Sequence, residues 1–294
     1  MEPVMAERRR LTDLAYRLLG SLADAEDVVQ ETYARWYTLS EHQQESIQNP
    51  AAWLTTVAGR ICLDLLGSAR VRRERYVGEW IPEPLPGRPQ WIGGRPDGAA
   101  PDPAERVTLD ESVSMAFLVV LEAMTPAERV AFVLHDVFQY PFAEVAGIVG
   151  RSPAACRQLA SSARRRIREH REAAPPAGDR TGVVRAFRRA WEAADVDALI
   201  DLLDPAVTAT GDGGGLVNAA PHPVVGAEEV GRFFAVRTGF RLAERTVNGE
   251  PGLVAEVDGA VVAVLAFDVA GDRIRRIWAV LNPEKLRHWT TRTP

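Results

Sequence analysis

The chain has 294 residues, a length that suits two or three domains rather than one. Hydrophobic residues make up 46% of it, so each domain can bury a core. No apolar run reaches the roughly 18 residues of a membrane span, and the polar, arginine-rich residues 1–10 lack the apolar stretch of a secretion signal. We therefore expect a cytoplasmic protein without a membrane contact. Cys62 and Cys156 have no metal-site spacing and are expected to be reduced core thiols.

The formal net charge of −5 argues against a nucleic-acid partner only until the distribution of charge is considered. Residues 70–75 hold four arginines and one glutamate, and residues 151–172 hold seven arginines and two glutamates. Acidic residues gather instead in 24–31 and 101–111. Two basic stretches can therefore contact nucleic acid although the whole chain is acidic.

Stretches rich in proline and glycine divide the chain into three blocks, 1–77, 107–172 and 183–294. Residues 78–106 hold seven prolines and five glycines, too many for a continuous helix or a central strand, and so predict an extended linker. Residues 173–182 predict a shorter hinge. The linker also carries large apolar side chains, which predict that it packs on another part of the protein: Trp80, Ile81, Trp91 and Ile92.

The first block is predicted to be helical. Leucines at helical spacing mark a helix that ends near Leu19, and Ser21 with Asp24 predicts a capping box for a second helix. Asn49 followed by Pro50 predicts the start of a third. The expected buried stripe of that third helix consists of Leu54, Val57, Ile61 and Leu65, which leaves Arg60 and Asp64 on another face.

The second block predicts a helix-turn-helix. Thr125 and the residues after it combine a capping box with a first-turn proline, and Pro141 starts a short helix that Gly150 can end. Ser152 and Pro153 then start the next helix. Two helices joined by so tight a turn are typical of a DNA-binding helix-turn-helix.

The helix after Ser152 has a polar face that suits DNA. Arginine can bind guanine in a bidentate fork, glutamine can read adenine, and serine can bond a phosphate or a base edge. The candidate residues, with the capping serine, are Ser152, Arg157, Gln158, Ser161, Arg164, Arg165 and Arg168. A merely solvated basic helix is the alternative, and the preceding helix and turn favour DNA binding.

The third block predicts an α+β domain. Residues 183–203 and 227–236 have helical patterns, and β-branched runs follow over 253–257, 260–269 and 273–280. If this domain encloses an apolar pocket, its candidate polar groups are Asp212, His222, Arg241 and Glu256. The candidate walls are Trp191, Phe233, Phe234, Phe267 and Trp278, although aromatic residues at such spacings are more often core.

Asp24, Asp27 and Glu31 line one face of the second predicted helix. The helix dipole explains acids in the first turn but not Glu31. A protein partner with a basic helical surface explains all three.

Three strings together resemble the extracytoplasmic-function (ECF) sigma factors of bacterial RNA polymerase. Residues 20–36, GSLADAEDVVQETYARW, and residues 49–75, which begin NPAAWLTTVAGR, resemble the family's second region. Residues 125–169, which begin TPAERVAFVLHDVFQYPF, resemble its fourth region. The resemblance implies two all-α domains, with 1–77 as region 2 and 107–172 as region 4, and a protein that directs transcription initiation.

The resemblance also implies partners and contact residues. The partners are core RNA polymerase, through its β′ clamp helices and β flap, and promoter DNA, as a −35 duplex and a −10 single strand. The residues implied for the polymerase are Asp24, Asp27, Gln30 and Glu31. Those implied for the −10 strand are Asn49, Trp53, Arg60, Asp64, Arg70, Arg72 and Arg73, where the arginines hold phosphates and Trp53 is either a stacking platform or core. The resemblance implies that the helix after Ser152 binds the −35 element.

Further motifs resemble the ECF subgroup that carries a SnoaL-like C-terminal domain, which is expected here at 183–294. They resemble its W-L-P-E-P, D-G-G-G-K and N-P-D-K-L motifs, with Leu216 in place of the lysine of the second. The matching residues are Trp80, Pro82, Glu83, Pro84, Asp212, Gly213, Gly214, Gly215, Asn282, Pro283, Glu284, Lys285 and Leu286. The subgroup implies a built-in regulator that packs on the linker, with no separate anti-sigma factor.

Two other functions remain open. A one-component regulator with a ligand-sensing domain would use 107–294 but leaves the acidic helix without a role. An enzyme directed to DNA has no supporting nucleophile, metal site or phosphate loop, since Asp212 and its three glycines lack the Lys-Ser/Thr of a P-loop. We expect no catalytic residue, no metal and no cofactor, and leave open an unknown small-molecule ligand in the C-terminal pocket.

Overall fold

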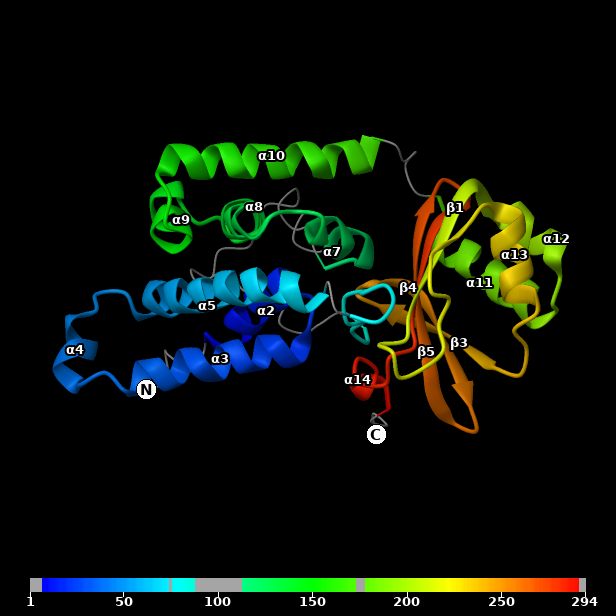
Figure 1. Ribbon diagram of the computed structural model, residues 1–294, viewed down its shortest axis with the longest axis horizontal. Helices are drawn as coiled ribbons and strands as arrows, with labels where there is room; N and C mark the ends of the chain where they lie inside the picture. Colours follow the sequence, from blue (N-terminus) through cyan, green and yellow to red (C-terminus); the bar gives the residue numbers. More distant parts are fainter. Residues whose placement is uncertain (1–6, 74–75, 88–112, 173–177, 291–294) are drawn as a thin grey trace. The chain divides into compact units, whose positions relative to one another are not determined.

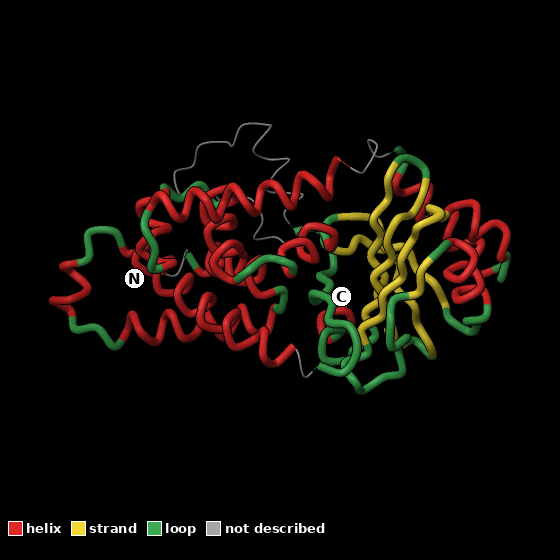
Figure 2. Tube along the Cα trace, turned by 45° about the horizontal axis from the view of Figure 1, so that its top comes forward, coloured by secondary structure: helices red, strands yellow, loops and turns green. Residues whose placement is uncertain are grey.

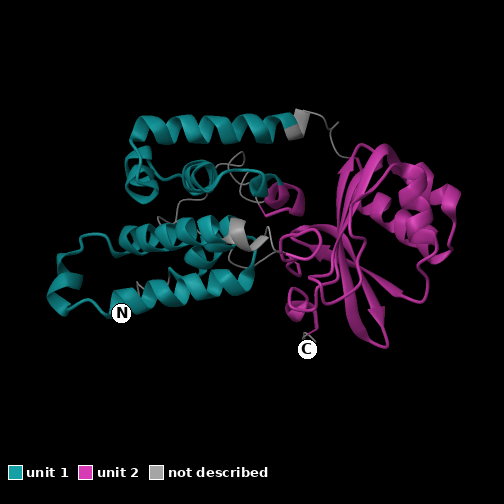
Figure 3. Ribbon diagram, viewed as in Figure 1, with its two compact units in different colours: residues 1–74, 90–112, 120–169 teal, residues 75–89, 113–119, 170–294 magenta. Residues whose placement is uncertain are grey.

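The computed structural model describes residues 7–73, 76–87, 113–172 and 178–290, with only the backbone of 69–73 and 170–172 (Figure 1). The chain forms two compact units (Figure 3). The first comprises residues 1–74, 90–112 and 120–169, and the second comprises 75–89, 113–119 and 170–294. Trp91 and Ile92 lie outside the described residues. Within the described part, no helix is both long and apolar enough to cross a membrane.

The N-terminal helices of the first unit are α2 (Arg8–Leu19), α3 (Leu22–Tyr37), α4 (Glu41–Ser46) and α5 (Pro50–Arg73). Gly20 ends α2 in the left-handed conformation, at φ +68°. Ser21 then caps α3, because its hydroxyl accepts the Asp24 N–H at 3.2 Å. Asn49 caps α5 in the same way, through the Ala52 N–H at 3.0 Å. These caps explain why the helices begin where the sequence predicts.

The buried face of α5 differs from the predicted one by about one residue. Leu54, Ala58, Cys62 and Leu66 are buried, whereas Val57, Ile61 and Leu65 are only half-buried. The predicted stripe followed the largest aliphatic residues, but the small residues allow the neighbouring helices to approach more closely. Arg60 and Asp64 are exposed, as expected.

The rest of the first unit contains the helix-turn-helix. The helix α7 (Met115–Glu122), whose first residues belong to the second unit, precedes α8 (Pro126–Phe132) and the short π-helix η1 (Val133–Val137). The motif itself consists of α9 (Phe142–Val149), the left-handed Gly150 and α10 (Pro153–Glu172). The predicted capping box of α8 is confirmed, because Thr125 and Glu128 bond reciprocally. This confirms the helical part of the predicted fold class.

The second unit is a mixed α/β domain, as predicted. Its six-stranded sheet has the order β2-β1-β6-β5-β4-β3, with only β1 and β6 parallel. The strands are the yellow segments of Figure 2. The strands are β1 (Leu203–Asp212), β2 (Val224–Val225), β3 (Arg241–Val247), β4 (Glu250–Val257), β5 (Ala260–Ala270) and β6 (Arg273–Val280). The helices are α11 (Arg180–Glu192), α12 (Val196–Leu202), α13 (Ala227–Ala235) and the short α14 (Arg287–Thr290).

One face of the sheet packs against α11, α12 and α13 (Figure 1). Aromatic rings fill the space between them, with the Phe187 ring 5.2 Å from Phe234 and 5.4 Å from Phe267, edge to face. The cavity beside Trp191 and Arg237 has a volume of only about 80 Å³. Phe187, Phe234 and Phe267 all belong to the buried core cluster between these helices and the sheet, so their rings pack as core.

The predicted pocket residues do not share one face of the sheet. Trp278 packs on the opposite face of the sheet, because side chains alternate along β6. His222 is exposed, and Arg241 binds Glu256 on the surface at 3.1 Å. The members of the predicted pocket set therefore do not all meet at one place in the described residues.

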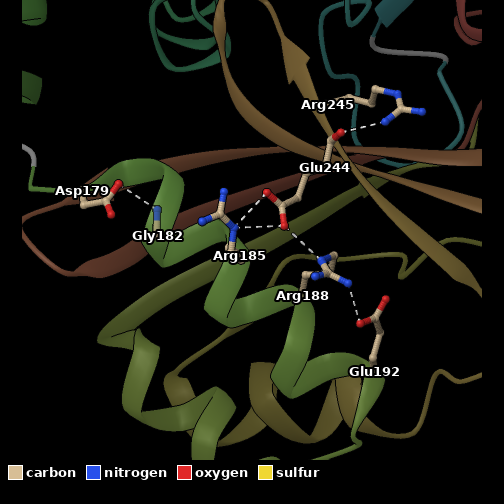
Figure 4. A network of polar contacts seen from close by, with 7 residues as sticks. All are labelled: Asp179, Gly182, Arg185, Arg188, Glu192, Glu244 and Arg245. Atoms are coloured by element: carbon tan, nitrogen blue, oxygen red, sulfur yellow. Dashed lines mark hydrogen bonds and ion pairs between the residues drawn. The ribbon is translucent and has the colours of Figure 1, made fainter.

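A surface network ties α11 to the edge strand β3 (Figure 4). Glu244 accepts from Arg185 at 3.3 Å and from Arg188 at 3.2 Å, and Arg188 also binds Glu192 at 2.7 Å. Such solvated pairs each contribute at most about 1 kcal/mol. They join α11 to β3 at the surface, beside the buried aromatic core.

Candidate functional site

The face of the sheet away from α11–α13 holds the linker segment, residues 76–87. Ile81 and Leu85 are each only 2% exposed. Ile81 packs in one apolar cluster with Val254 and Trp278 of the sheet and with Leu286. The linker is therefore a structural part of the C-terminal unit, as its apolar residues predicted.

The carboxylate of Asp212, at the end of β1, is the centre of this site. It is fully buried and accepts four hydrogen bonds. Two come from the linker segment, from the Tyr76 hydroxyl at 2.6 Å and the Ile81 N–H at 3.0 Å. The others come from the Gly214 N–H at 3.1 Å and the Lys285 ammonium at 2.7 Å. A buried carboxylate needs such complete compensation.

Lys285 supplies the positive charge that compensates the buried Asp212 carboxylate. Its ammonium donates to the Ile81 carbonyl at 2.5 Å and lies 4.2 Å from the centre of the Trp80 ring, a cation–π contact. Asn282 donates to the Tyr76 hydroxyl at 2.9 Å. Burial, and then the hydrogen bond to Asp212, raise the pKa of Tyr76, so its hydroxyl stays protonated and can donate.

The structure brings the three motif segments of the sequence together here. Pro82, Glu83 and Pro84 are buried, and the Trp289 indole N–H donates to the Pro84 carbonyl at 2.7 Å. Pro283 and Glu284 are exposed, in a turn where the Glu284 N–H bonds to the Asn282 side chain at 3.0 Å. Neither Tyr76 nor Trp289 was among the predicted site residues, because no local pattern marks a tertiary hydrogen bond.

The positions after Asp212 require glycine because other residues approach their backbone closely. Gly214 and Gly215 have φ of +62° and +71°. A Cβ on Gly214 would lie 2.3 Å from the Asn282 amide nitrogen, and one on Gly213 would lie 2.1 Å from the Val217 carbonyl oxygen. Leu216, which replaces the motif lysine, is 62% exposed.

The acidic residues predicted to bind polymerase lie on α3. Asp27, Gln30 and Glu31 are exposed and Asp24 is half-buried. Glu31 pairs with Arg35 at 2.8 Å, where both side chains remain about half exposed. The four side chains are therefore accessible from the helix surface, and we refer to them as the acidic face.

The residues predicted for the −10 strand lie on or beside α5. Trp53 is half-buried and meets the Trp36 ring edge-on at 5.2 Å, so core packing accounts for part of its surface. Arg60 donates to the Gly147 carbonyl of α9 at 2.9 Å. The short helix α4 precedes this segment, and Asn49 caps α5. The side chains of Arg70, Arg72 and Arg73 lie outside the described residues.

The face of α10 predicted to read DNA is largely open. Arg157, Gln158, Ser161, Arg165 and Arg168 are exposed, whereas Cys156, Ala160 and Ala163 are buried. Arg164 differs, because it binds Asp136 of η1 at 2.5 Å. Ser152 caps the helix by accepting the Ala155 N–H at 3.2 Å. The helix therefore presents an exposed surface rich in arginine, with the exposed Glu169 beside Arg168.

Comparisons with known proteins agree with this arrangement. Residues 4–72 match the family Sigma-70 region 2, and residues 114–167 match Sigma-70, region 4. The chain is 40% identical to the ECF RNA polymerase sigma factor SigJ of Mycobacterium tuberculosis, over 95% of this chain and 91% of that protein. It is 38% identical to the "Probable ECF RNA polymerase sigma factor SigI" of the same species, over 96% and 92%.

A solved structure is similar along almost the whole chain. The crystal structure of the Mycobacterium tuberculosis extracytoplasmic function sigma factor SigJ superposes with a TM-score of 0.70 at 37% identity, and covers 96% of both chains. The similarity therefore includes the C-terminal α/β domain and is not limited to the helical segments.

The buried ion pair predicts a strong stability effect. We expect Lys285→Met to lower the free energy of unfolding by about 3–5 kcal/mol, because Asp212 would remain buried without its charge partner. Chemical denaturation followed by tryptophan fluorescence measures this. Arg287→Met, two residues away on the exposed surface, should change little. The double variant Asp212→Asn with Lys285→Met should lose less than Lys285→Met alone, and an equal or larger loss would contradict the role of the pair.

Proposed function

Because the chain belongs to the extracytoplasmic-function RNA polymerase sigma factors, which direct transcription initiation, we propose that its C-terminal domain regulates this activity by holding the linker. Sigma factors are not enzymes, and their partners are core RNA polymerase and promoter DNA. We further propose that the domain has no catalytic activity of its own.

The observation that carries the proposal is the single carboxylate of Asp212, which binds the linker segment at both Tyr76 and Ile81. A linker held in this way cannot at the same time follow another path through a partner. The linker is then either bound to the C-terminal domain or free to contact a partner. Any factor that binds one of these two states more tightly shifts the equilibrium towards that state. Because the chain supplies its own linker-binding domain, we propose regulation without a separate anti-sigma factor.

Contacts inside the first unit support a restrained resting state. The hydroxyls of Thr55 on α5 and Tyr140 share a buried hydrogen bond of 2.8 Å. The buried Arg129 donates to the Leu18 carbonyl at 2.9 Å, and Arg60 donates to α9. Each of these bonds joins the region 2 match to the region 4 match. In this state Arg60 binds protein, and we propose that it must leave the Gly147 carbonyl to contact the −10 strand.

The roles of the two DNA-binding segments follow from their exposed surfaces. We assign the acidic face to the β′ clamp helices, and region 4 to the β flap and the −35 duplex. Asn49, Trp53, Arg60 and Asp64, with Arg70, Arg72 and Arg73, are assigned to the −10 single strand. The arginines would hold phosphates, and the exposed face of α10 would read base edges. A small-molecule regulator would need a different site from the filled aromatic core.

Removal of the C-terminal domain should alter transcription. We expect a form that ends near Arg180 to differ from the full chain in transcript yield with core polymerase in vitro, because its linker has no binding domain. The double variant Asp212→Asn with Lys285→Met, which retains the domain, should shift the yield in the same direction. Equal yield from all three forms at every promoter would refute regulation through the linker.

The reading surface of α10 can be tested with neighbouring arginines. We expect Arg164→Ala or Arg165→Ala to weaken binding to a −35 duplex by about 1–3 kcal/mol if the side chain reads a base. Arg166→Ala removes the same charge from another face, where Arg166 bonds to the Ala123 carbonyl at 3.3 Å, and serves as the control. Fluorescence anisotropy at two salt concentrations separates base reading from phosphate contact. Unchanged affinity for both variants would exclude α10 as the reading helix.

The acidic face predicts a charge-dependent association. We expect Asp24→Arg with Asp27→Arg to abolish co-purification with core polymerase, because the reversed charge repels a basic partner surface. Glu228→Arg with Glu229→Arg makes the same change of charge on the exposed surface of α13 and should co-purify normally. Circular dichroism checks that both proteins remain folded. Normal co-purification of the α3 variant would rule out this docking surface.

A further inference from the structure

Asn248 occupies the tight turn between β3 and β4. With φ of +51°, followed by Gly249 at +83°, it forms the Asn-Gly turn that favours a two-residue hairpin. Its side chain is unusual for a turn residue, because Asn248 is only 1% exposed. The next hairpin provides the comparison. Asp258 and Gly259 have nearly the same φ, +51° and +79°, and Asp258 is exposed. The turn alone therefore does not require burial.

The Asn248 side chain joins two segments that are far apart in the sequence. Its amide oxygen accepts the Leu85 N–H at 2.9 Å, and its amide nitrogen donates to the Val113 carbonyl at 3.0 Å. The Asn248 backbone N–H also donates to the Leu85 carbonyl at 2.9 Å. One side chain thus holds the linker segment and the residue that lies two positions before α7.

Neighbouring contacts fix both segments at the same place. The Gly87 N–H bonds to the Thr246 carbonyl at 2.8 Å, so the linker segment continues along the end of the edge strand β3. On the other side, Met115 is 3% exposed and packs in the cluster that contains Ile81 and Val247. Met115 is the first residue of α7, and the match to Sigma-70, region 4 begins at residue 114.

We propose that Asn248 is a positioning residue that couples the linker to the start of region 4, so that the C-terminal domain holds and releases the two together. The inference rests on the proposed regulatory function. It adds a second contact that holds the linker segment, separate from the contact with Asp212. An amide is needed here because the site requires one acceptor, for Leu85, and one donor, for Val113. Aspartate has the same shape and tolerates the turn, but it cannot donate and would set a carboxylate against a carbonyl oxygen.

Hydrogen exchange of the full chain, measured by mass spectrometry, tests the coupling. We expect Asn248→Asp to raise the exchange rate of residues 113–119 at least about tenfold, because the Val113 carbonyl loses a buried donor. Residues 85–87 should change less, since the acceptor for Leu85 is kept. Asn248→Gly keeps the turn without adding charge and should accelerate both segments. Asp258→Asn, the matched change in the other hairpin, should affect neither.

A second perturbation separates coupling from a local structural role. In the wild-type background, Lys285→Met should accelerate exchange both in residues 85–87 and in residues 113–119. In the Asn248→Asp background, it should accelerate only residues 85–87 further. Unchanged exchange of residues 113–119 in Asn248→Asp would overturn the proposal, as would an equal acceleration across the strands β4 and β5. These readouts require no polymerase, so they stand or fall independently of the transcription experiment.

Discussion

The arrangement of the C-terminal unit depends on the compensation of one buried charge. The Asp212 carboxylate has no exposed surface, and its donors come from three parts of the chain, the linker, the glycine loop and the turn at 282–286. A carboxylate in such a place destabilises the fold unless all of these donors are present. The requirement explains why the glycine loop approaches Asn282 so closely and why Trp80 lies on Lys285. The interaction is therefore specific, because a linker that packed elsewhere would remove the Tyr76 and Ile81 donors from this buried carboxylate.

Two separate sets of contacts hold different parts of the linker segment. Asp212 and Lys285 hold residues 76–81 by charge and hydrogen bonds, whereas Asn248 holds Leu85 and Val113 through neutral amide bonds. Between them, Ile81 and Met115 bury apolar surface on the same face of the sheet. A face that would otherwise be open to solvent is thus covered by segments from outside the C-terminal domain. This gives the sheet one face for its own core and another that binds the linker segment and the start of α7.

Local signals in the sequence predicted much of the helical part. Thr125, Gly150 and Ser152 act through bonds to residues at most four positions away, and so their effects could be inferred without a structure. The register of α5 was harder, because Cys62 and Ala58 carry little hydrophobic signal although they are buried. The aromatic residues of the C-terminal domain suggested a pocket, but whether rings line a space or fill it depends on their tertiary packing. For the same reason the partners of Tyr76 and Asn248 could not be predicted, since they lie more than 130 residues away.

Lys285 carries the only side-chain amine of the whole sequence, and in the bound state of the linker that amine is buried against Asp212 and Ile81. Every other cationic side chain of the chain is an arginine or a histidine. Acylating reagents that select for primary amines therefore meet one internal target, whose reactivity depends on whether the linker is bound. The arginine-rich composition thereby leaves one lysine, besides the N-terminal amine, whose acylation reports whether the linker is bound.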